Sequence, residues 1–364
     1  MKRIIFVTGT RADYGKLKSL ILILQKNKAY KVNIFVTGMH NLKKFGNTWD
    51  ALRKDKIKNI YKFKNQRIGD RMDLILSKTI IGFSNYTEKI KPDLIVVHGD
   101  RVETLACAIV GSLNNIRTAH IEGGEVSGTV DEILRHAISK LSHIHFVTNG
   151  KAKKRLIQMG ELKKNIYVIG SPDIDIVNSK DLPTIEQVKK KYEIKFENYA
   201  LAILHPITTE QRMIKKNTNE FLKSILSSKL NYIFIYPNND QGSEIIFNEY
   251  KNISQKKSVK ILPSMKFEYY LTALKNAQFI IGNSSSGIIE APFYGVPTIN
   301  IGKRQNNRAK LKSIHNCNFN HKKIFSLINK FSKKTKRFKS NKFFGKGNSF
   351  INFLNILKDK NIWK

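Results

Sequence analysis

The feature that most constrains the fold is a series of short, continuous apolar runs, rich in β-branched residues, that alternate with stretches of helical periodicity. Such runs predict parallel strands buried on both faces of a sheet, and the stretches between them predict the covering helices. In the first half of the chain the runs fall at 4–9, 31–38, 93–99, 118–124, 144–149 and 166–172. The sequence therefore predicts a doubly wound α/β domain.

A second series of apolar runs follows a charged connector at 179–199. These runs fall at 200–206, 232–238, 259–264, 277–283 and 296–302. A chain of 364 residues is long enough for roughly two domains, each with its own core. We therefore expect a second Rossmann-like domain. A cleft between the two is expected at the carboxyl ends of their strands, where open α/β sheets bind ligands.

The net charge of +37, from 65 Lys and Arg against 28 Asp and Glu, raises the question of a nucleic-acid partner. The lysines are scattered along the chain, with a denser run only at 328–347, and no nucleic-acid-binding motif accompanies them. Compositional bias explains this charge better than a binding function does. We expect no nucleic-acid partner.

Membrane spans and disulfides are not expected either. No apolar run approaches the ~18 residues of a membrane span, and the short run near the start is too brief for a signal peptide. The two cysteines, Cys107 and Cys317, cannot form a disulfide framework. These features predict a cytoplasmic protein without a membrane partner.

Charged side chains follow several of the predicted strands. Arg11 follows the first run, Asp100 and Arg101 follow the third, and Glu122 follows the fourth. Because Asp100 and Glu122 end neighbouring runs, we expect them to share the floor of the cleft. Carboxylates beside arginines suit general acid–base chemistry on an anionic substrate, so both are candidate catalytic residues.

Asp131, just inside a predicted helix, has two interpretations. It is either a third member of the acid–base set or an acid that favours the start of the helix. The second interpretation is supported by Thr129 and Glu132, which match the spacing of a capping box.

The stretch GNSSSGIIEAP, at 282–292, predicts an anion site. A strand that ends at Ile281, followed by a Gly/Ser turn and a helix that begins near Ser286, would aim backbone N–H groups at one point. Ser284 and Ser285 would add hydroxyl donors, and Glu290 would accept from a ribose hydroxyl. The alternative is a plain helix cap without a ligand.

The histidines do not predict a metal site. His120, His136, His143 and His145 lie close together in the sequence, but no zinc-binding spacing is present, and we interpret them as core or supporting residues. His205 differs because it ends the first predicted strand of the second domain. There it can meet a phosphate, or it can simply turn the chain before Pro206.

Several stretches together resemble one family. They read TGTRADYGKL, VTGMH, HGDRVETLA, HIEGGEVSGTVDEILRHAISKLSHIHFVTN, GSPDID, HPITTE, YPNND and GNSSSGIIEAPFYGVPTINIGKRQNNR. These motifs are similar to those of the hydrolysing UDP-N-acetylglucosamine 2-epimerases, bacterial enzymes of sialic acid biosynthesis. The resemblance runs in order from residue 3 to about residue 308.

The resemblance implies an α/β, GT-B-like fold in which two Rossmann-like, doubly wound domains face a central cleft. The expected divisions are an N-terminal domain at 1–178, with the carboxylate cluster, and a C-terminal, UDP-binding domain at 179–345. A helix within 346–364 would pack back on the N-terminal domain. A homodimer or homotetramer is also implied.

The implied reaction converts UDP-GlcNAc and water into UDP and N-acetylmannosamine without a metal or other cofactor. A base removes the C2 proton while UDP leaves C1, which gives 2-acetamidoglucal. Water then adds at C1, and a proton returns to C2 from the opposite face. By matching motifs, the acid–base set is Asp100, Glu122 and Asp131. The implied substrate contacts are Arg11, Arg101, His205, Asn238, Ser284, Ser285, Gly287, Glu290 and Arg304.

Other substrates and other classes of protein are alternatives to this interpretation. Relatives with similar motifs act on UDP- or GDP-linked 2,4-diacetamido-2,4,6-trideoxyglucose, which leads to legionaminic acid. The non-hydrolysing epimerases return UDP-ManNAc, and a GT-B glycosyltransferase would pass the sugar to an acceptor with its C2 configuration retained. The sequence favours UDP-GlcNAc and the hydrolysing branch.

Overall fold

The computed structural model describes residues 1–42, 48–128, 130–238, 240–333 and 336–363. The chain divides into two compact units. Unit 1 comprises 1–125, 131–178 and 343–364, and unit 2 comprises 126–130 and 179–342. The second boundary therefore falls between residues 342 and 343, slightly earlier than the expected division after residue 345. Each unit contains one parallel sheet.

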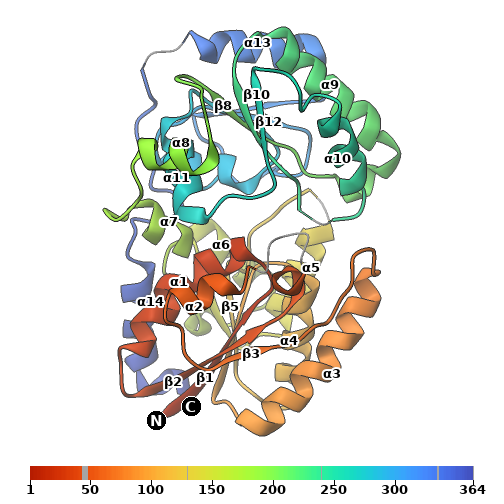
Figure 1. Ribbon diagram of the computed structural model, residues 1–364. Helices are drawn as coiled ribbons and strands as arrows, with labels where there is room; N and C mark the ends of the chain where they lie inside the picture. Colours follow the sequence, from red (N-terminus) through yellow and green to blue (C-terminus); the bar gives the residue numbers. More distant parts are fainter. Residues whose placement is uncertain (43–47, 129, 239, 334–335, 364) are drawn as a thin grey trace. The chain divides into compact units, whose positions relative to one another are not determined.

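The sheet of unit 1 has the strand order β3-β2-β1-β4-β5-β6-β7, and its strands all pair in parallel (Figure 1). The strands are β1 (Lys2–Thr8), β2 (Tyr30–Val36), β3 (Ile60–Lys62), β4 (Leu94–His98), β5 (Thr118–Ile121), β6 (Ile144–Val147) and β7 (Ile166–Val168). The order reverses between β1 and β4, so the chain leaves these neighbouring strands in opposite directions. Ligands of doubly wound sheets bind at such a switch point.

Helices cover both faces of this sheet. They are α1 (Arg11–Gln25), α2 (Asp50–Lys54), α3 (Met72–Ile90), α4 (Val102–Leu113), α5 (Val130–Lys140), α6 (Gly150–Gln158), α7 (Pro172–Val177) and α14 (Ser349–Lys358), with 3-10 turns η1 (Gly38–Asn41), η3 (Lys163–Asn165) and η6 (Lys360–Trp363). Alternate residues of β1 enter different cores: Ile4 and Phe6 face one, and Ile5 and Val7 face the other. Burial on both faces explains why this strand is continuously apolar.

Helix α14 packs against α1 and α7 of unit 1, as Figure 1 also shows. Phe353 is fully buried, with its ring centroid 4.7 Å from that of Phe146 and 6.2 Å from that of Phe6. Asp175 of α7 holds the start of the helix, because its Oδ1 accepts from Ser349 N at 2.8 Å. The end of the chain thus completes the core of the first unit.

The sheet of unit 2 has the order β10-β9-β8-β11-β12-β13 and is also parallel. Its strands are β8 (Ala200–Ile203), β9 (Tyr232–Ile235), β10 (Val259–Leu262), β11 (Ile280–Gly282), β12 (Thr298–Ile301) and β13 (Ile314–Cys317). Sequence analysis missed β13 and, in unit 1, β3; both are short, and both lie at a sheet edge, where apolar patterning is weak. The switch point of this sheet lies between β8 and β11.

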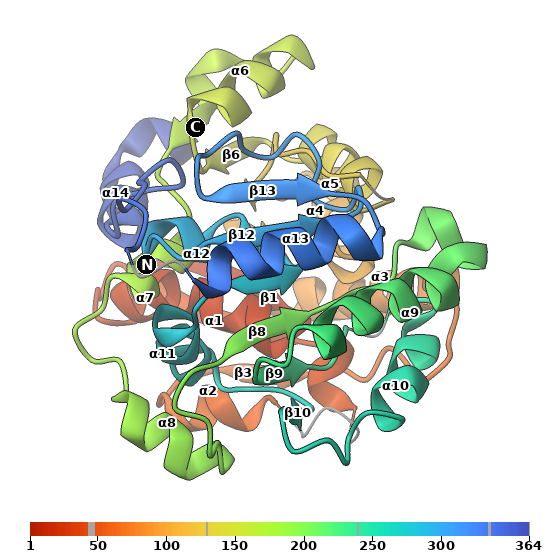
Figure 2. The same cartoon turned by 90° about the horizontal axis from the view of Figure 1, so that it is seen from above.

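The helices of unit 2 are α8 (Ile185–Tyr192), α9 (Ile214–Ser227), α10 (Ser243–Lys251), α11 (Phe267–Asn276), α12 (Glu290–Phe293) and α13 (His321–Ser332), with 3-10 turns η4 (Thr208–Met213) and η5 (Ser285–Gly287). Helices α9 and α13 pack against each other and share one core with β8, β9 and β11 (Figure 2). Among the described helices, none has the length and apolarity needed to cross a membrane.

The docking of α14 gives a first prediction. Phe353→Ala should lower the free energy of unfolding of unit 1 by about 3–5 kcal/mol, because it leaves a cavity among packed aromatic rings. Ile351→Ala, on the same helix at a position 46% exposed, should change it by less than about 0.5 kcal/mol. Urea unfolding, followed by circular dichroism, measures both variants. Equal effects would show that α14 does not pack as described.

Candidate active site

The first cluster of the candidate site lies at the switch point of unit 1, where α1 begins. Thr10 caps this helix, with its side chain accepting from Asp13 N at 3.1 Å. Asp13 Oδ2 accepts from Gly9 N at 2.9 Å, and Asp13 Oδ1 lies 2.8 Å from Nδ1 of His98, the last residue of β4. A carboxylate can only accept, so His98 Nδ1 carries the proton of this bond.

Glu122 lies directly after β5, beside His98. Its Oε2 is 3.3 Å from His98 Nε2 and 3.8 Å from Lys16 Nζ, and its Oε1 accepts from Ser171 Oγ at 2.9 Å. The side chain is almost completely buried, with 3% of the residue exposed. Its backbone has a φ of +65°, a left-handed conformation that costs energy for a residue with a Cβ. Such strain at a buried acid, in a crevice of the sheet, points to a functional position.

Asp173, near the start of α7, supports the other side of Glu122. Its Oδ2 lies 2.8 Å from Lys16 Nζ and accepts from Ser171 Oγ at 3.5 Å. Asp173 is fully buried. Burial raises its pKa, in spite of the opposing charge of Lys16.

The electrostatics of the cluster keep His98 protonated. Burial alone would lower the pKa of His98, but the charge of Glu122 and the hydrogen bond to Asp13 outweigh it and raise the pKa to about 10. Burial would likewise raise the pKa of Asp13, but the bond and charge of His98 hold it below its usual value. The His98 imidazolium and the Asp13 carboxylate are thus charged together at neutral pH.

Asp100 has different partners from Glu122. It follows β4, which pairs with β5 as expected, but its carboxylate accepts from Nη2 of Arg135 on α5. Arg135 is buried, with 3% exposed, whereas the Asp100 side chain is 26% exposed, so this ion pair has one buried partner and one that solvent reaches. Asp131 lies four residues before Arg135 on the same helix and therefore on the same face. The capping alternative for Asp131 involves Thr129, which lies outside the described residues.

The predicted arginines of unit 1 flank the same crevice. Arg11 is the first residue of α1. Arg101 Nε donates to Glu103 Oε2 at 3.3 Å, and Glu103 is itself buried, with 1% exposed. An unbranched apolar residue in place of Glu103 would leave the guanidinium without this fixed acceptor. The orientation of Arg101 therefore depends on an acid that sequence analysis did not select.

In unit 2, His205 and Asn283 link the ends of β8 and β11 at the switch point. His205 N donates to Asn283 Oδ1 at 2.7 Å, and Asn283 Nδ2 donates to His205 O at 2.8 Å. Asn238 N donates to His205 Nδ1 at 3.1 Å, so that nitrogen is unprotonated. Burial, and then the charge of Arg304, lowers the pKa of His205 to about 3. The imidazole of His205 is therefore neutral, and its Nε2 carries the proton and can act as a donor.

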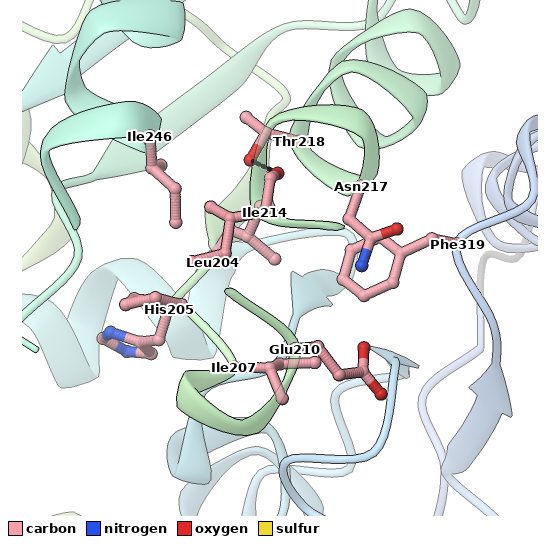
Figure 3. A pocket seen from close by; sticks show the side chains of 10 residues that line it. Leu204, His205, Ile207, Glu210, Ile214, Asn217, Thr218, Ile246 and Phe319 are labelled. Atoms are coloured by element: carbon pink, nitrogen blue, oxygen red, sulfur yellow. Dashed lines mark hydrogen bonds between the residues drawn. The ribbon is translucent and has the colours of Figure 1, made fainter. Parts of the chain in front are cut away.

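A pocket lies beside His205 (Figure 3). Its walls are mainly apolar, with Glu210 and Asn217 as polar groups, and the lining residues are Leu204, His205, Pro206, Ile207, Glu210, Ile214, Asn217, Thr218, Ile246 and Phe319. Lys303 Nζ lies 3.6 Å from Glu210 Oε1 and places a positive charge near this wall.

Arg304 is held by the backbone around it. Its Nη1 donates to Asn283 O at 3.3 Å, and its own carbonyl accepts from Gly128 N at 3.1 Å. A Cβ at Gly128 would lie 2.0 Å from Lys303 O, so only glycine allows this approach. Gly128, which belongs to unit 2, thus fixes the loop that carries Arg304.

The serine turn differs from the prediction of a helix that begins near Ser286. The structure has the 3-10 turn η5 at 285–287, and α12 begins only at Glu290 and is four residues long. The N–H groups of Gly287, Ile288 and Ile289 donate to carbonyls of the turn itself. The helical turn therefore begins at Ser285, as a short 3-10 turn, and the N–H groups of Gly287, Ile288 and Ile289 are used within it.

The hydroxyl groups of the serine turn have separate roles. Ser286 is buried and bonds Tyr270 OH, whereas Ser284 and Ser285 are only half-buried. Gly287 lies against Thr298, whose Oγ1 donates to Gly287 O at 2.7 Å. Glu290 is buried beside Tyr270; burial first, and then the Glu290 charge, raises the pKa of that phenol. Ser284 and Ser285 are thus the hydroxyls of the turn that a ligand can reach.

His120 and His145 are held by groups inside unit 1. His120 is fully buried between Ser139 Oγ, at 3.0 Å from its Nδ1, and Gly99 O, at 2.8 Å from its Nε2. Burial lowers the pKa of His120 to about 3. His145 Nε2 lies 3.1 Å from Glu161 Oε2. Within the described part of the chain, no group of three or more His, Cys, Asp or Glu is arranged to hold a metal.

Sequence analysis did not select the residues that surround Glu122 and Asp100. They are Asp13, Lys16, His98, Ser171, Asp173 and Arg135. Asp13 and His98 had a signal, since both follow predicted strands. Lys16, Ser171 and Asp173 occur within two of the quoted motifs, but only the folded chain shows that they meet.

Two doubly wound units, with a charged cluster at the switch point of the first and neutral hydrogen-bonding groups at that of the second, define a GT-B-like α/β protein. The chain belongs to the UDP-N-acetylglucosamine 2-epimerase family, whose model matches residues 23–358. The solved structure of UDP-GlcNAc 2-epimerase from Methanocaldococcus jannaschii, in complex with UDP-GlcNAc and UDP, has a TM-score of 0.82 and 23% identity, over 98% of this chain and 99% of that one. That likeness supports the fold.

Two curated relatives are more similar in sequence. The UDP-N-acetylglucosamine 2-epimerase of Neisseria meningitidis serogroup B is 46% identical over 90% of this chain and 87% of the relative. The UDP-N,N'-diacetylbacillosamine 2-epimerase (hydrolyzing) of Legionella pneumophila is 34% identical over 86% of this chain and 84% of the relative.

The histidine environments give a second prediction. In the folded protein His98 should titrate near pH 10, because Glu122 and Asp13 stabilise its charged form, whereas His120 and His205 should stay neutral from pH 8 down to pH 5. NMR of the imidazole ring resonances measures this, and His98→Gln assigns one signal by removing it. A His98 midpoint near its ordinary value of 6.5 would contradict the described cluster.

Proposed function

We propose that this protein is a hydrolysing UDP-N-acetylglucosamine 2-epimerase that converts UDP-GlcNAc and water into UDP and N-acetylmannosamine, as the first step of sialic acid biosynthesis. The observation that carries the proposal is the strained, buried Glu122, held between His98 and Lys16 at the switch point of unit 1. A carboxylate fixed there, with Asp100 on the next strand, suits proton transfer at a weakly acidic carbon.

These groups suit a reaction in two stages, an elimination followed by a hydration. One carboxylate of the set Asp100, Glu122 and Asp131 takes the C2 proton as the C1–O bond to UDP breaks, which leaves a C1–C2 double bond. Water then adds its oxygen to C1 and gives up a proton, and C2 receives a proton on the opposite face. Inversion at C2 requires acid–base groups on both faces of the sugar, which a set of several carboxylates can supply.

The leaving group needs its own stabilisation, because the diphosphate gains charge as the bond breaks. We assign this part to Ser284 and Ser285, with His205 and Arg304. Gly287, whose N–H donates to Ser284 O and which lies against Thr298, supports the turn that carries the two serines. Glu290 would accept from the ribose, and Asn238 would complete the nucleotide contacts. From unit 1, Arg11 and Arg101 would contribute positive charge toward the diphosphate or the sugar.

The choice of sugar rests on how similar the chain is in sequence to each of the two curated relatives. The relative named for UDP-N-acetylglucosamine is 46% identical, and the one named for a diacetamido sugar is 34% identical. We therefore propose UDP-GlcNAc as the substrate and keep the 2,4-diacetamido nucleotide sugar as the alternative. A cytoplasmic location and a homodimer or homotetramer belong to the same proposal.

Proton NMR of the purified protein with UDP-GlcNAc in heavy water, without added metal, tests the proposal. Free UDP together with N-acetylmannosamine that carries deuterium at C2 is the expected result. UDP-ManNAc would assign the chain to a non-hydrolysing reaction instead. Release of UDP only from a 2,4-diacetamido nucleotide sugar would establish the alternative substrate.

Asp100→Asn should abolish UDP release and leave UDP affinity largely intact. Loss of an acid–base group costs about 10²–10⁴-fold in turnover, whereas the UDP contacts assigned above lie mostly in unit 2. UDP release by a coupled assay and UDP affinity by calorimetry are the two measurements. Asp93→Asn, an acid of unit 1 that pairs with Lys2, is the matched control. Full turnover of the Asp100 variant would remove this residue from the mechanism.

Ser285→Ala should weaken UDP binding roughly 5- to 30-fold, as expected for the loss of a hydrogen bond of about 1–2 kcal/mol to a charged group. Thermal unfolding should stay unchanged, because the hydroxyl is half-buried and faces the ligand. Ser254→Ala, at an exposed serine of unit 2, is the control for both measurements. Unaltered UDP affinity of Ser285→Ala would return this serine to a structural role in the turn.

A further inference from the structure

The residues around Glu122 form a chain of alternating charge. Its order is Asp13, His98, Glu122, Lys16 and Asp173, and the successive distances between charged atoms are 2.8, 3.3, 3.8 and 2.8 Å. Each acid lies against a cation, and each cation lies between two acids. Glu122 is the central member, and Asp13 and Asp173 are the ends.

Both ends of the chain are held rigidly. Asp13 accepts from Gly9 N through the oxygen that does not face His98, and its backbone belongs to the capped first turn of α1. Asp173 is fully buried in α7, and Ser171 Oγ bridges it to Glu122 at 3.5 and 2.9 Å. The chain therefore connects α1, the ends of β4 and β5, and the start of α7.

We infer that Asp13 and Asp173 are positioning residues for Glu122, Asp13 through His98 and Asp173 through Lys16 and Ser171. The inference rests on the proposed function and deepens it, since it names groups that act on the reaction without touching the substrate. Neither residue belongs to the acid–base set or to the substrate contacts assigned above.

The physical reason is the cost of isolated charge in a buried site. A buried imidazolium or ammonium is stable only while an acid faces it, and a buried carboxylate is stable only while a cation faces it. Asp13 accepts the Nδ1 proton of His98, so the ring presents its Nε2 side to Glu122. Without Asp13, the ring would lose both this orientation and one of the two charges that keep it protonated.

The consequence can be read from a pH profile. The groups that face His98 are Asp13 from α1, Glu122 after β5, Asp173 from α7 and the neutral ring of His120 in β5. With both adjacent acids present, the pKa of His98 is raised to about 10. Removal of the Asp13 charge lowers this pKa, so His98 loses its proton at a lower pH. If Glu122 needs the imidazolium, turnover must then fall at a lower pH as well.

The first test compares Asp13→Asn with the wild type in kcat and KM for UDP release from UDP-GlcNAc, between pH 6 and pH 10. We expect kcat of the variant at pH 8 to fall by about tenfold or more, with KM changed less than about threefold, because a misoriented histidine impairs proton transfer more than binding. The alkaline limb of its kcat profile should move to lower pH by at least about one unit.

Asp55→Asn is the matched control. Asp55 accepts from Lys18 of α1 at 2.8 Å and from Tyr14 at 2.9 Å, but it has no part in the Glu122 chain. It should leave kcat and its pH profile unchanged. Thermal unfolding of both variants separates a loss of fold from a loss of positioning.

The second test concerns the other end. Asp173→Asn should lower kcat by a similar factor without moving the alkaline limb, since its partner is Lys16 and not His98. An alkaline limb that stays in place in Asp13→Asn would overturn the role of Asp13. A kcat within twofold of wild type in Asp173→Asn would overturn the role of Asp173.

The His98 titration by NMR keeps the inference testable if a variant fails to fold. A wild-type midpoint near 6.5 would overturn the inference, and a midpoint above 9 would support it. This readout does not depend on turnover. If the wild type releases no UDP from any of the nucleotide sugars, the proposed function fails, while the His98 midpoint still decides whether Asp13 and Glu122 hold an imidazolium.

Discussion

Parallel pairing of β1 with β2 on one edge and with β4 on the other is the constraint on which the candidate site depends. From β1 the sheet continues to one side with β2 and β3 and to the other side with β4 to β7. The segments that follow β1 and β4 therefore diverge and leave room for side chains between them. Asp13 and His98 come from these segments. The parallel pairing of these strands therefore determines both the buried core and the position of the crevice.

Charge neutralisation in a shielded site explains the composition of that crevice. Glu122, Asp173 and His98 are all buried, and each would be unfavourable there by itself. Their alternation of sign offsets part of the desolvation cost, although at Asp173 burial still outweighs the charge of Lys16, and it also fixes the position of each group. Asp100 follows the same rule with a different partner, Arg135. The two acids that follow neighbouring strands thus have separate supporting partners.

Unit 2 repeats the topology of unit 1 with different chemistry. Its switch point carries a neutral histidine, the Asn283 amide and short hydroxyl side chains, in place of paired acids and cations. Neutral donors around Arg304 are consistent with the proposed anionic group, because they provide hydrogen bonds without the charge of the cluster in unit 1. Glu290 is buried beside Tyr270 and Tyr294. The residues at equivalent places in the two sheets therefore differ in charge.

Much of the fold was predictable from sequence alone, because strands buried on both faces must be continuously apolar and because glycine, serine and charged residues mark where they end. That local pattern, together with the motifs, determined the two α/β units, the family, and the positions of Asp100, Glu122 and His205. It did not determine the serine turn, whose donors are used within η5, nor the edge strands β3 and β13. Above all, it did not determine partners: Asp13 and His98 are 85 residues apart, and Asp175 and Ser349 are 174 apart. Only the tertiary structure decided those pairs, because a charge buried in a fold is stabilised by whatever lies nearest in space and not by its neighbours along the chain.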